Sequence, residues 1–315
     1  MSEFFLELFS EEIPSKLQVN ARKSLLENFK KFFEQNEIFI KGKFNTFSTP
    51  NRLVVHIDRI TKQISKKSEE IRGPNIKSPD KALDGFLRSN NIGKSKVFVK
   101  KTEKGEFYFY KKPSQKINTV DLLKENIPNI LSKIIWNKSM KWGDHKLFWG
   151  RPLKSILSVF DGEKLVFNFN HLKSSNITFI NKELEEKTKA FNSFKSYNSF
   201  FKSLNIFIDQ EKRKSFISNE IVKLSIKKKI NINLKKELLD EITNIVEKPK
   251  ILFCEFDKKY LMIPKEILII TMQNHQKYFP TFDSKENLTN NFFVVADSKD
   301  PKGFVKLGNE RVIEA

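Results

Sequence analysis

The alternation of apolar and polar residues predicts a strand, a helix and two further strands in the first part of the chain. Phe4–Phe9 is a short, mostly apolar run bounded by polar residues, which is typical of a buried strand. From Leu17 to Phe29, apolar side chains recur every four residues and predict an amphipathic helix. Pro14 suits the start of this helix, because the first turn needs no backbone N–H donor. The elements expected here are a strand at 4–9, a helix at 14–35, and strands at 44–48 and 52–60.

The rest of the chain shows the same two periods, separated by polar segments. Residues 61–77 are polar and include Gly73-Pro74, so this segment is expected to be a loop or linker. Asp161-Gly162 between two apolar runs predicts a tight hairpin, and Pro128 within a helical pattern predicts a kink or a break. The expected helices lie at 79–87, 119–134, 194–204, 209–229, 234–246 and 265–274. The expected strands lie at 96–100, 106–111, 155–160, 164–169, 251–256 and 291–296.

The order of these elements predicts an α+β protein of several domains, with strand-rich modules flanking a helical middle. At 315 residues, the chain is long enough for two or three domains of ordinary size. The expected divisions are an N-terminal α+β module at 1–75, a second α+β module at 76–190, a helical segment at 191–249 and an α+β segment at 250–315. The last segment shows no closing helix cap, so we expect the chain to stop within a domain.

The basic composition adds information about the partner. The chain has 58 Lys and Arg residues against 38 Asp and Glu, a formal net charge of +20, which favours a polyanionic partner such as RNA. Only eight of the basic residues are Arg, and Asn, Ile and Phe are also abundant, so part of the lysine excess reflects overall composition. The chain contains one Cys and no run of eighteen apolar residues. We therefore expect a reducing, cytoplasmic compartment and no membrane partner.

The sequence contains no complete catalytic or metal-binding pattern. The four histidines are not spaced as zinc ligands, and no glycine-rich phosphate loop occurs. Glu11-Glu12 could hold a cation, but acidic residues near a helix N-terminus are common for electrostatic reasons alone. Cys254 lies in an apolar run and is expected to be a small buried hydrophobe. We therefore predict no catalytic residue, no metal and no cofactor on this chain.

One segment combines all three tryptophans with basic residues. Trp136, Trp142 and Trp149 lie between residues 136 and 151, together with Lys138, Lys141, Lys146 and Arg151. Aromatic rings interleaved with cations suit unpaired bases and phosphates. The pattern is equally consistent with tryptophans that anchor a core and cations that decorate a turn. Both interpretations stay open at this point.

A second polar string, His275-Gln-Lys-Tyr-Phe279, follows the helix expected at 265–274. These side chains could contact the end of an RNA. They could also cap the preceding helix by hydrogen bonding, which is the simpler explanation.

Eleven short strings, in order along the chain, together resemble the β subunit of the bacterial-type, heterotetrameric glycyl-tRNA synthetase. Two of the longer strings are Leu6–Pro14, with Glu11-Glu12 inside it, and Leu239–Glu247. The others are Thr49–Leu53, Lys81–Phe86, Lys104–Glu106, Ser139–Gly143, Arg151-Pro152, Pro264–Glu266, Thr271-Met272, His275–Phe279 and Gly308–Val312. The chain departs from the family at Asn51, which replaces the first Arg of Thr-Pro-Arg-Arg-Leu. It also departs at 174–181, which lacks the usual Gly-His-Arg-Phe.

The resemblance implies a role in the glycylation of tRNA. In that family the α subunit holds the aminoacylation site for glycine and ATP, with Mg²⁺ expected beside the ATP. The β subunit binds tRNA(Gly) and is needed for charging, and the two assemble as α2β2 in the cytoplasm. The family continues with an HD-like domain and an anticodon-binding domain, and this chain is expected to end before both.

The residues expected to contact RNA combine the basic and aromatic positions of these strings. They are Arg52, Lys141, Trp142, Arg151 and Lys277. The alternative is a non-catalytic scaffold that docks the α subunit without touching tRNA.

Overall fold

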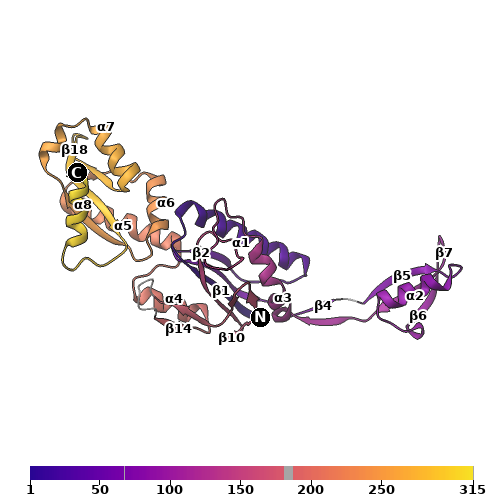
Figure 1. Ribbon diagram of the computed structural model, residues 1–315. Helices are drawn as coiled ribbons and strands as arrows, with labels where there is room; N and C mark the ends of the chain where they lie inside the picture. Colours follow the sequence, from indigo (N-terminus) through magenta and orange to yellow (C-terminus); the bar gives the residue numbers. More distant parts are fainter. Residues whose placement is uncertain (67, 181–186, 315) are drawn as a thin grey trace. The chain divides into compact units, whose positions relative to one another are not determined.

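The computed structural model describes residues 1–66, 68–180 and 187–314, which form two compact units (Figure 1). The larger unit contains residues 1–60 and 124–315, and the smaller unit contains residues 61–123. Helices and several separate sheets occur in the same chain, so the predicted α+β class is confirmed. The four-module division at 75, 190 and 249 stays a prediction.

The first sheet of the larger unit is antiparallel and has the strand order β10-β9-β1-β3-β2. Its strands are β1 (Ser2–Ser10), β2 (Phe44–Ser48), β3 (Arg52–Ile60), β9 (Leu153–Phe160) and β10 (Glu163–Lys164). β1 lies between β3 and β9, so its backbone is paired on both sides. The predicted strands at 4–9, 44–48 and 52–60 are confirmed. The hairpin at Asp161-Gly162 is confirmed too, with both residues at positive φ.

Successive residues of β1 pack against different helices, because side chains alternate between the two faces of a strand. On one face, the ring of Phe4 lies 5.7 Å from that of Phe29 in α1 (Ser15–Gln35). On the other face, the ring of Phe5 lies 4.7 Å from that of Tyr197 in α4 (Phe194–Ser203). Figure 1 shows α1 lying along one side of the sheet. Both faces of β1 are therefore buried, as its continuous apolar run predicts.

The second sheet of the larger unit has the order β15-β17-β18-β16 and is also antiparallel. Its strands are β15 (Asn231–Ile232), β16 (Lys250–Glu255), β17 (Phe279–Phe282) and β18 (Leu288–Ala296). One face packs against α5 (Gln210–Lys228) and α6 (Lys236–Ile245), with Phe279 and Phe293 at the centre. The other face buries Cys254 beside Phe292, as expected for a small hydrophobe in a strand. Helical segments that cover this face are η2 (Lys258–Met262), the π-helical η3 (Thr271–Gln276) and α8 (Phe304–Glu314).

In its described residues, the smaller unit contains two sheets and the helix α2, and the helix α3 begins at its end. The strands β4 (Gln63–Lys66) and β8 (Gln115–Asn118) pair with each other. A three-stranded sheet has the order β5 (Glu69–Asn75), β7 (Gly105–Lys112), β6 (Val97–Thr102). It is accompanied by α2 (Asp80–Ser89) and the short η1 (Lys94–Lys96). The hairpin of β6 and β7 was expected from the sequence.

The prediction of a loop at 61–77 is wrong, because this segment contains β4 and β5. Both strands are largely exposed, so they lack the apolar alternation by which a strand is recognised. In β4 only Ile64 is buried. The register of β5 against β7 shifts between Arg72 and Asn75, and this irregularity accommodates Pro74, which cannot donate to a ladder.

Three further expectations are corrected by the structure. The helix α3 (Thr119–Ser132) continues through Pro128, so of the expected kink or break, the break does not occur; Ile127, Ile130 and Leu131 are buried around this position. Residues 164–169 are not one strand, because β10 ends at Lys164 and β11 (Asn168–Phe169) pairs instead with β12 (Leu172–Lys173). The helix predicted at 265–274 is α7 (Lys265–Ile270) followed by η3. The remaining short strands are β13 (Ile177–Phe179) and β14 (Thr188–Ala190).

Candidate functional site

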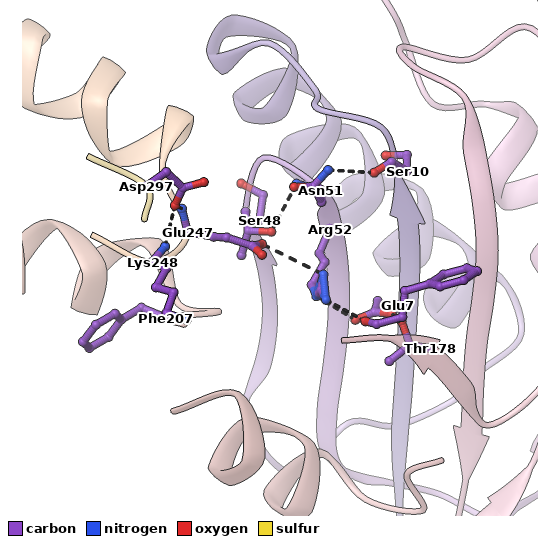
Figure 2. Close-up of polar contacts among 12 residues, drawn as sticks. Glu7, Ser10, Ser48, Asn51, Arg52, Thr178, Phe207, Glu247, Lys248 and Asp297 are labelled. Carbon is purple, nitrogen blue, oxygen red and sulfur yellow. Dashed lines mark hydrogen bonds and ion pairs between the residues drawn. The ribbon is translucent and has the colours of Figure 1, made fainter. Parts of the chain in front are cut away.

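Three of the family-like strings meet in a buried cluster of charged residues in the larger unit. Glu7 comes from β1, Arg52 begins β3, and Glu247 follows α6. Arg52 Nε lies 3.4 Å from Glu7 Oε2, and Arg52 Nη1 lies 3.9 Å from Glu247 Oε2. All three residues are buried, and Figure 2 shows Arg52 between the two carboxylates. We call these residues the arginine cluster.

The surroundings of the arginine cluster supply further polar and aromatic contacts. The hydroxyls of Thr178 and Tyr197 both donate hydrogen bonds to Glu7. Arg52 Nη2 donates to the carbonyl oxygen of Phe179 at 2.7 Å. The guanidinium carbon also lies 4.7 Å from the ring centre of Phe9 and 4.5 Å from that of Phe201. Such contacts partly compensate the cost of removing the charge from water.

Burial and charge act in opposite directions on the groups of the arginine cluster. Burial tends to lower the pKa of Arg52, but the carboxylates of Glu247 and Glu7 outweigh it and raise this pKa. Burial raises the pKa of Glu7, against the effects of Arg52, Thr178 and Tyr197. Burial and the Glu7 charge raise the pKa of Tyr197 well above its usual value, so its hydroxyl stays protonated and donates. Arg52 therefore stays charged, whereas burial favours the protonated form of the Glu7 carboxyl.

A second buried arginine lies beside the arginine cluster and has different partners. Arg213 in α5 donates to the carbonyl oxygens of Thr243 at 2.7 Å, Ser48 at 2.8 Å and Phe207. Its partners are backbone carbonyls, and burial lowers its pKa to about 10. Gln18 of α1 similarly donates to the carbonyl oxygen of Asn244. These bonds connect the first sheet and α1 to the helices that cover the second sheet.

The turn before β3 is also fixed internally. Asn51 is 1 % exposed, and its amide donates to the carbonyl oxygen of Ser10 at 3.1 Å (Figure 2). The backbone N–H of Ser10 in turn donates to the carbonyl oxygen of Asn51 at 2.8 Å. Asn51, where the chain departs from the family string, therefore links the end of β1 to the turn.

The segment after α6 is held by an acidic side chain. The backbone N–H groups of Glu247 and Lys248 both donate to Asp297, each at 2.8 Å.

The side chain of Arg52 is fully buried and held by both carboxylates, so it is paired inside the protein. Its partners lie far away in the sequence, so no local pattern could have revealed the pairing. The expected RNA contact at Arg52 stays a prediction, and its burial does not support it. The residues that sequence reasoning missed are Glu7 and Glu247. Both residues lie within family-like strings, and each is a charged residue in the middle or at the end of an apolar run.

The segment between α3 and β9 presents Lys141 and Trp142 in a different environment. The Lys141 ammonium lies 4.7 Å from the ring centre of Phe148, which is 58 % exposed. Trp142 is partly buried and makes edge contacts with His145 and His171, at centroid distances of 6.2 and 5.7 Å. The rings of the two histidines are stacked, 3.6 Å apart and 3° from parallel. We call Trp142, His145, His171, Lys141 and Phe148 the aromatic surface.

One histidine of the aromatic surface is favoured in its neutral form. Partial burial and the neighbouring His145 lower the pKa of His171. Stacked rings beside an exposed lysine offer flat faces and a cation, which suits unpaired bases and phosphates. No spacing in the sequence indicates that His171 lies beside Trp142.

The other two tryptophans have a packing role, so the two interpretations of this segment apply to different residues. Trp149 is 1 % exposed, and its ring lies 5.0 Å from that of Trp136. Gly150 allows this contact, because a Cβ at that position would lie 2.4 Å from the Trp136 ring. Arg151 is partly buried and donates to the carbonyl oxygen of Gly150 at 3.0 Å.

Lys277 closes the helix that precedes it, as the capping interpretation predicts. Its backbone adopts the left-handed conformation at φ 61°, and its N–H donates to the carbonyl oxygen of Met272. The Lys277 ammonium donates to the carbonyl oxygen of Asn274 at 3.0 Å and lies 2.9 Å from a carboxylate oxygen of Glu241. Lys141, Trp142 and Arg151 thus share one segment, whereas Arg52 and Lys277 belong to other elements and are internally paired.

Neither a metal centre nor a membrane span occurs in the part of the chain that the structure describes. No three His, Cys, Asp or Glu side chains gather there as ligands for a metal ion. None of the helices described is long and apolar enough to cross a bilayer. The expectations of no catalytic residue and no metal stay predictions.

Comparison with known proteins gives a consistent result along the chain. The family model for the glycyl-tRNA synthetase beta subunit matches residues 4–315. The chain is 36 % identical over 316 residues to the glycine–tRNA ligase beta subunit of Rickettsia conorii and covers 47 % of that protein. It is 35 % identical over 318 residues to that of Rickettsia felis, and 35 % identical over 316 residues to that of Rickettsia prowazekii. In each comparison the whole chain is covered.

The chain spans about half the length of the curated relatives it matches. The match nevertheless includes every family-like string from Leu6 to Val312, and it extends over both units of the structure. The chain therefore belongs to the glycyl-tRNA synthetase beta subunit family.

Proposed function

We propose that this chain is the front part of the β subunit of a heterotetrameric glycine–tRNA ligase. It contributes tRNA binding and assembly to the ATP-dependent glycylation of tRNA(Gly) in the cytoplasm. The observation that carries the proposal is the family match over residues 4–315. The relatives are named as glycine–tRNA ligase beta subunits, and a β subunit requires a partner subunit to act.

In this proposal the α subunit of an α2β2 assembly holds the aminoacylation site, with glycine, ATP and Mg²⁺. The chain described here positions tRNA rather than making or breaking bonds. The arginine cluster is buried and its charged groups are paired with one another, and this supports a structural role. A reacting centre would need access for substrate, which these side chains lack.

We assign RNA contact to Lys141, Trp142 and Arg151. The exposed lysine provides a phosphate partner, and the partly exposed indole provides a face on which a base can stack. A stacked base contributes about 1–3 kcal/mol, which is enough to orient a single-stranded end. Lys277 is left out of this set because its ammonium is paired with Glu241.

The test measures glycine attachment to tRNA by the α subunit, with and without the β subunit that contains this chain. The proposal predicts that charging depends on the β subunit and falls when Lys141, Trp142 and Arg151 are replaced together. Equal charging without the β subunit would reject it.

A scaffold that docks the α subunit is the second candidate function, favoured by an exposed apolar surface. Met262 is 90 % exposed, Ile267 is 56 % exposed and Ile270 is 51 % exposed, all within η2 and α7. Exposed apolar residues that lie close together often mark a protein interface. Binding of tRNA to the chain alone, measured over a range of salt concentrations, separates the two functions. Phosphate contacts weaken steeply with salt, and a pure scaffold shows no binding even at low salt.

A further inference from the structure

Two cavities of the larger unit have the same volume but different chemistry. Each encloses about 440 Å³. One is lined by Tyr278, Val294 and Val305, and its single lysine, Lys277, is already paired with Glu241. The other is lined by three lysines and an aromatic ring, and we call it the lysine cavity. Its lining includes Asn205, Phe216, Lys248, Lys250, Lys299 and Asp300.

The lysine cavity carries an excess of positive charge. Among the residues that the structure describes, none of the ammonium groups of Lys248, Lys250 and Lys299 takes part in an ion pair. By contrast, Lys214, on the same helix as Phe216, lies 2.5 Å from a carboxylate oxygen of Asp240. Unpaired ammonium groups around a concave site attract an anion, because their charges add within the cavity.

Asp300 is the one acidic residue among the described residues that line the lysine cavity, and the protein already uses it. The carboxylate of Asp300 accepts hydrogen bonds from the backbone N–H groups of Lys306 at 2.9 Å and Val305 at 3.1 Å. These bonds, led by that of Lys306, lower the pKa of Asp300 below its usual value and direct its charge to the start of α8. Asp300 therefore offsets part of the lysine charge without pairing directly with any of the three.

One wall of the lysine cavity is aromatic and held in place. Phe216 is partly buried, and its ring is stacked on that of Phe207 with centroids 4.8 Å apart and planes at 29°. The backbone N–H of Phe207 donates to the carbonyl oxygen of Glu247, so this wall is tied to the turn that carries Lys248. Figure 2 shows Phe207 beside this turn. Asn205, exposed at the rim, adds an amide with both donor and acceptor atoms.

We propose that the lysine cavity binds a nucleoside phosphate, with the base against Phe216 and the phosphate among Lys248, Lys250 and Lys299. A flat ring next to clustered cations is the combination by which proteins hold an unpaired nucleotide. The volume is in the range of small-molecule sites and fits a single nucleotide, not a duplex. The ligand comes either from free mononucleotides or from an unpaired nucleotide of an RNA strand. This inference goes beyond the proposed function and does not require it.

The first experiment measures binding of defined probes to the chain by titration calorimetry. The probes are the four ribonucleoside 5′-monophosphates, a short single-stranded oligoribonucleotide, inorganic phosphate and adenosine. We expect a monophosphate or the oligonucleotide to bind at least tenfold more tightly than inorganic phosphate or adenosine, since each of the latter lacks one half of the recognition. Binding of monophosphates identifies free nucleotide as the source, and binding of the oligonucleotide alone identifies RNA. If neither binds more tightly than inorganic phosphate, the inference is wrong.

The second experiment locates that binding by charge. Lys248, Lys250 and Lys299 are replaced together by Gln, and we expect affinity to fall by about tenfold or more, since exposed ionic contacts add modestly. The matched control replaces three exposed lysines of α1, Lys16, Lys30 and Lys31, by Gln and removes the same charge. Equal loss in both triple variants would mean that net charge, not the cavity, determines binding, and this overturns the inference.

The third experiment tests the aromatic wall. Phe216→Leu keeps an apolar side chain in place and is expected to weaken nucleotide binding several-fold while leaving inorganic phosphate unaffected. Phe216→Tyr restores the ring and is expected to restore affinity; unchanged affinity in Phe216→Leu contradicts base stacking. Glycylation with the α subunit is measured on the same variants. Normal glycylation without nucleotide binding rejects only this inference, whereas nucleotide binding without any need for the β subunit in charging rejects only the proposed function.

Discussion

The arginine cluster and the aromatic surface both arise from family-like strings of basic and aromatic residues, yet they have opposite environments. Arg52 is buried, lies between two carboxylates and contacts two phenylalanine rings. Lys141 is exposed, and its ammonium lies over a ring that is itself largely exposed. A cation near aromatic rings therefore has two different roles in this chain. Where other parts of the fold supply buried carboxylates, the cation stabilises the structure; where they do not, it stays available to a ligand.

The largest expected effect is on stability, from the loss of the cation in the arginine cluster. Arg52→Met leaves Glu7 and Glu247 buried without their partner, and we expect a loss of about 3–5 kcal/mol in the free energy of unfolding. Urea unfolding followed by circular dichroism measures this. Arg151→Met is the matched control, since Arg151 is only partly buried and makes one hydrogen bond to a backbone carbonyl; its effect should stay below about 1 kcal/mol. Similar losses in both variants would remove the distinction between the two regions.

The next effect is on binding, at the aromatic surface. Trp142→Ala removes the indole that we assign to base stacking, so tRNA affinity should fall by about 1–3 kcal/mol, while the unfolding free energy changes little. Binding of labelled tRNA at one salt concentration is the measurement. Trp149→Phe serves as control, because Trp149 is buried and should affect stability more than affinity. Unchanged affinity in Trp142→Ala would leave this surface without its assigned role.

A smaller effect is expected at Lys141. Lys141→Gln should reduce the slope of log affinity against log salt by about one, because one phosphate contact is lost. The weakening should be similar for different tRNA sequences, since phosphate contacts carry no sequence information. The same change at Lys30 of α1, which is also exposed, should leave the slope unaltered.

The smallest effect concerns pH and the Glu7 carboxyl. Because its pKa is raised in the folded protein above the usual 4.5, the folded state binds this proton at a pH where the unfolded chain does not. The contribution of Glu7 to stability should therefore rise as pH falls from 7 through the folded pKa, and level off below about 4.5. Unfolding of the wild type and Glu7→Gln is compared over this range, where each tenfold gain in proton affinity on folding corresponds to about 1.4 kcal/mol. A constant difference between them would show that the pKa of Glu7 is not raised.

Sequence periodicity located most elements of the larger unit, because their side chains are sorted by burial. The strands β2 and β3 and the helices α4, α5 and α6 agree with the prediction within two residues. The exposed strands β4 and β5 were missed for lack of such sorting. The helix α8 was missed as well, although Asp300 accepts from backbone N–H groups of its first turn. Asp300 lies several residues before the start of α8, so it does not stand at the position where an N-cap residue is looked for in a sequence.

The candidate sites were less predictable than the elements. The segment with three tryptophans was recognised, but the sequence did not show which of them would be buried. The answer depends on Gly150, which lets Trp136 pack against Trp149, and on His171, which comes from a distant loop. Likewise, Arg52 was expected at a surface because Glu7 and Glu247 could not be placed beside it. Contacts between residues far apart in the sequence decide these roles, and local patterns do not contain them.

The pairing of β4 with β8 has a consequence for how the chain can evolve. Gln63 lies opposite Asn118, and the backbone N–H of Thr119 donates to the carbonyl oxygen of Lys62 at 2.8 Å. The chain therefore enters and leaves the smaller unit through residues that lie next to each other. A segment whose two ends lie side by side can be inserted, deleted or replaced during evolution. Joining the residues on either side of it costs little loop-closure entropy. In the first sheet of the larger unit, β3 and β9 flank β1, and this order does not depend on the residues that lie between β3 and β9 in the sequence.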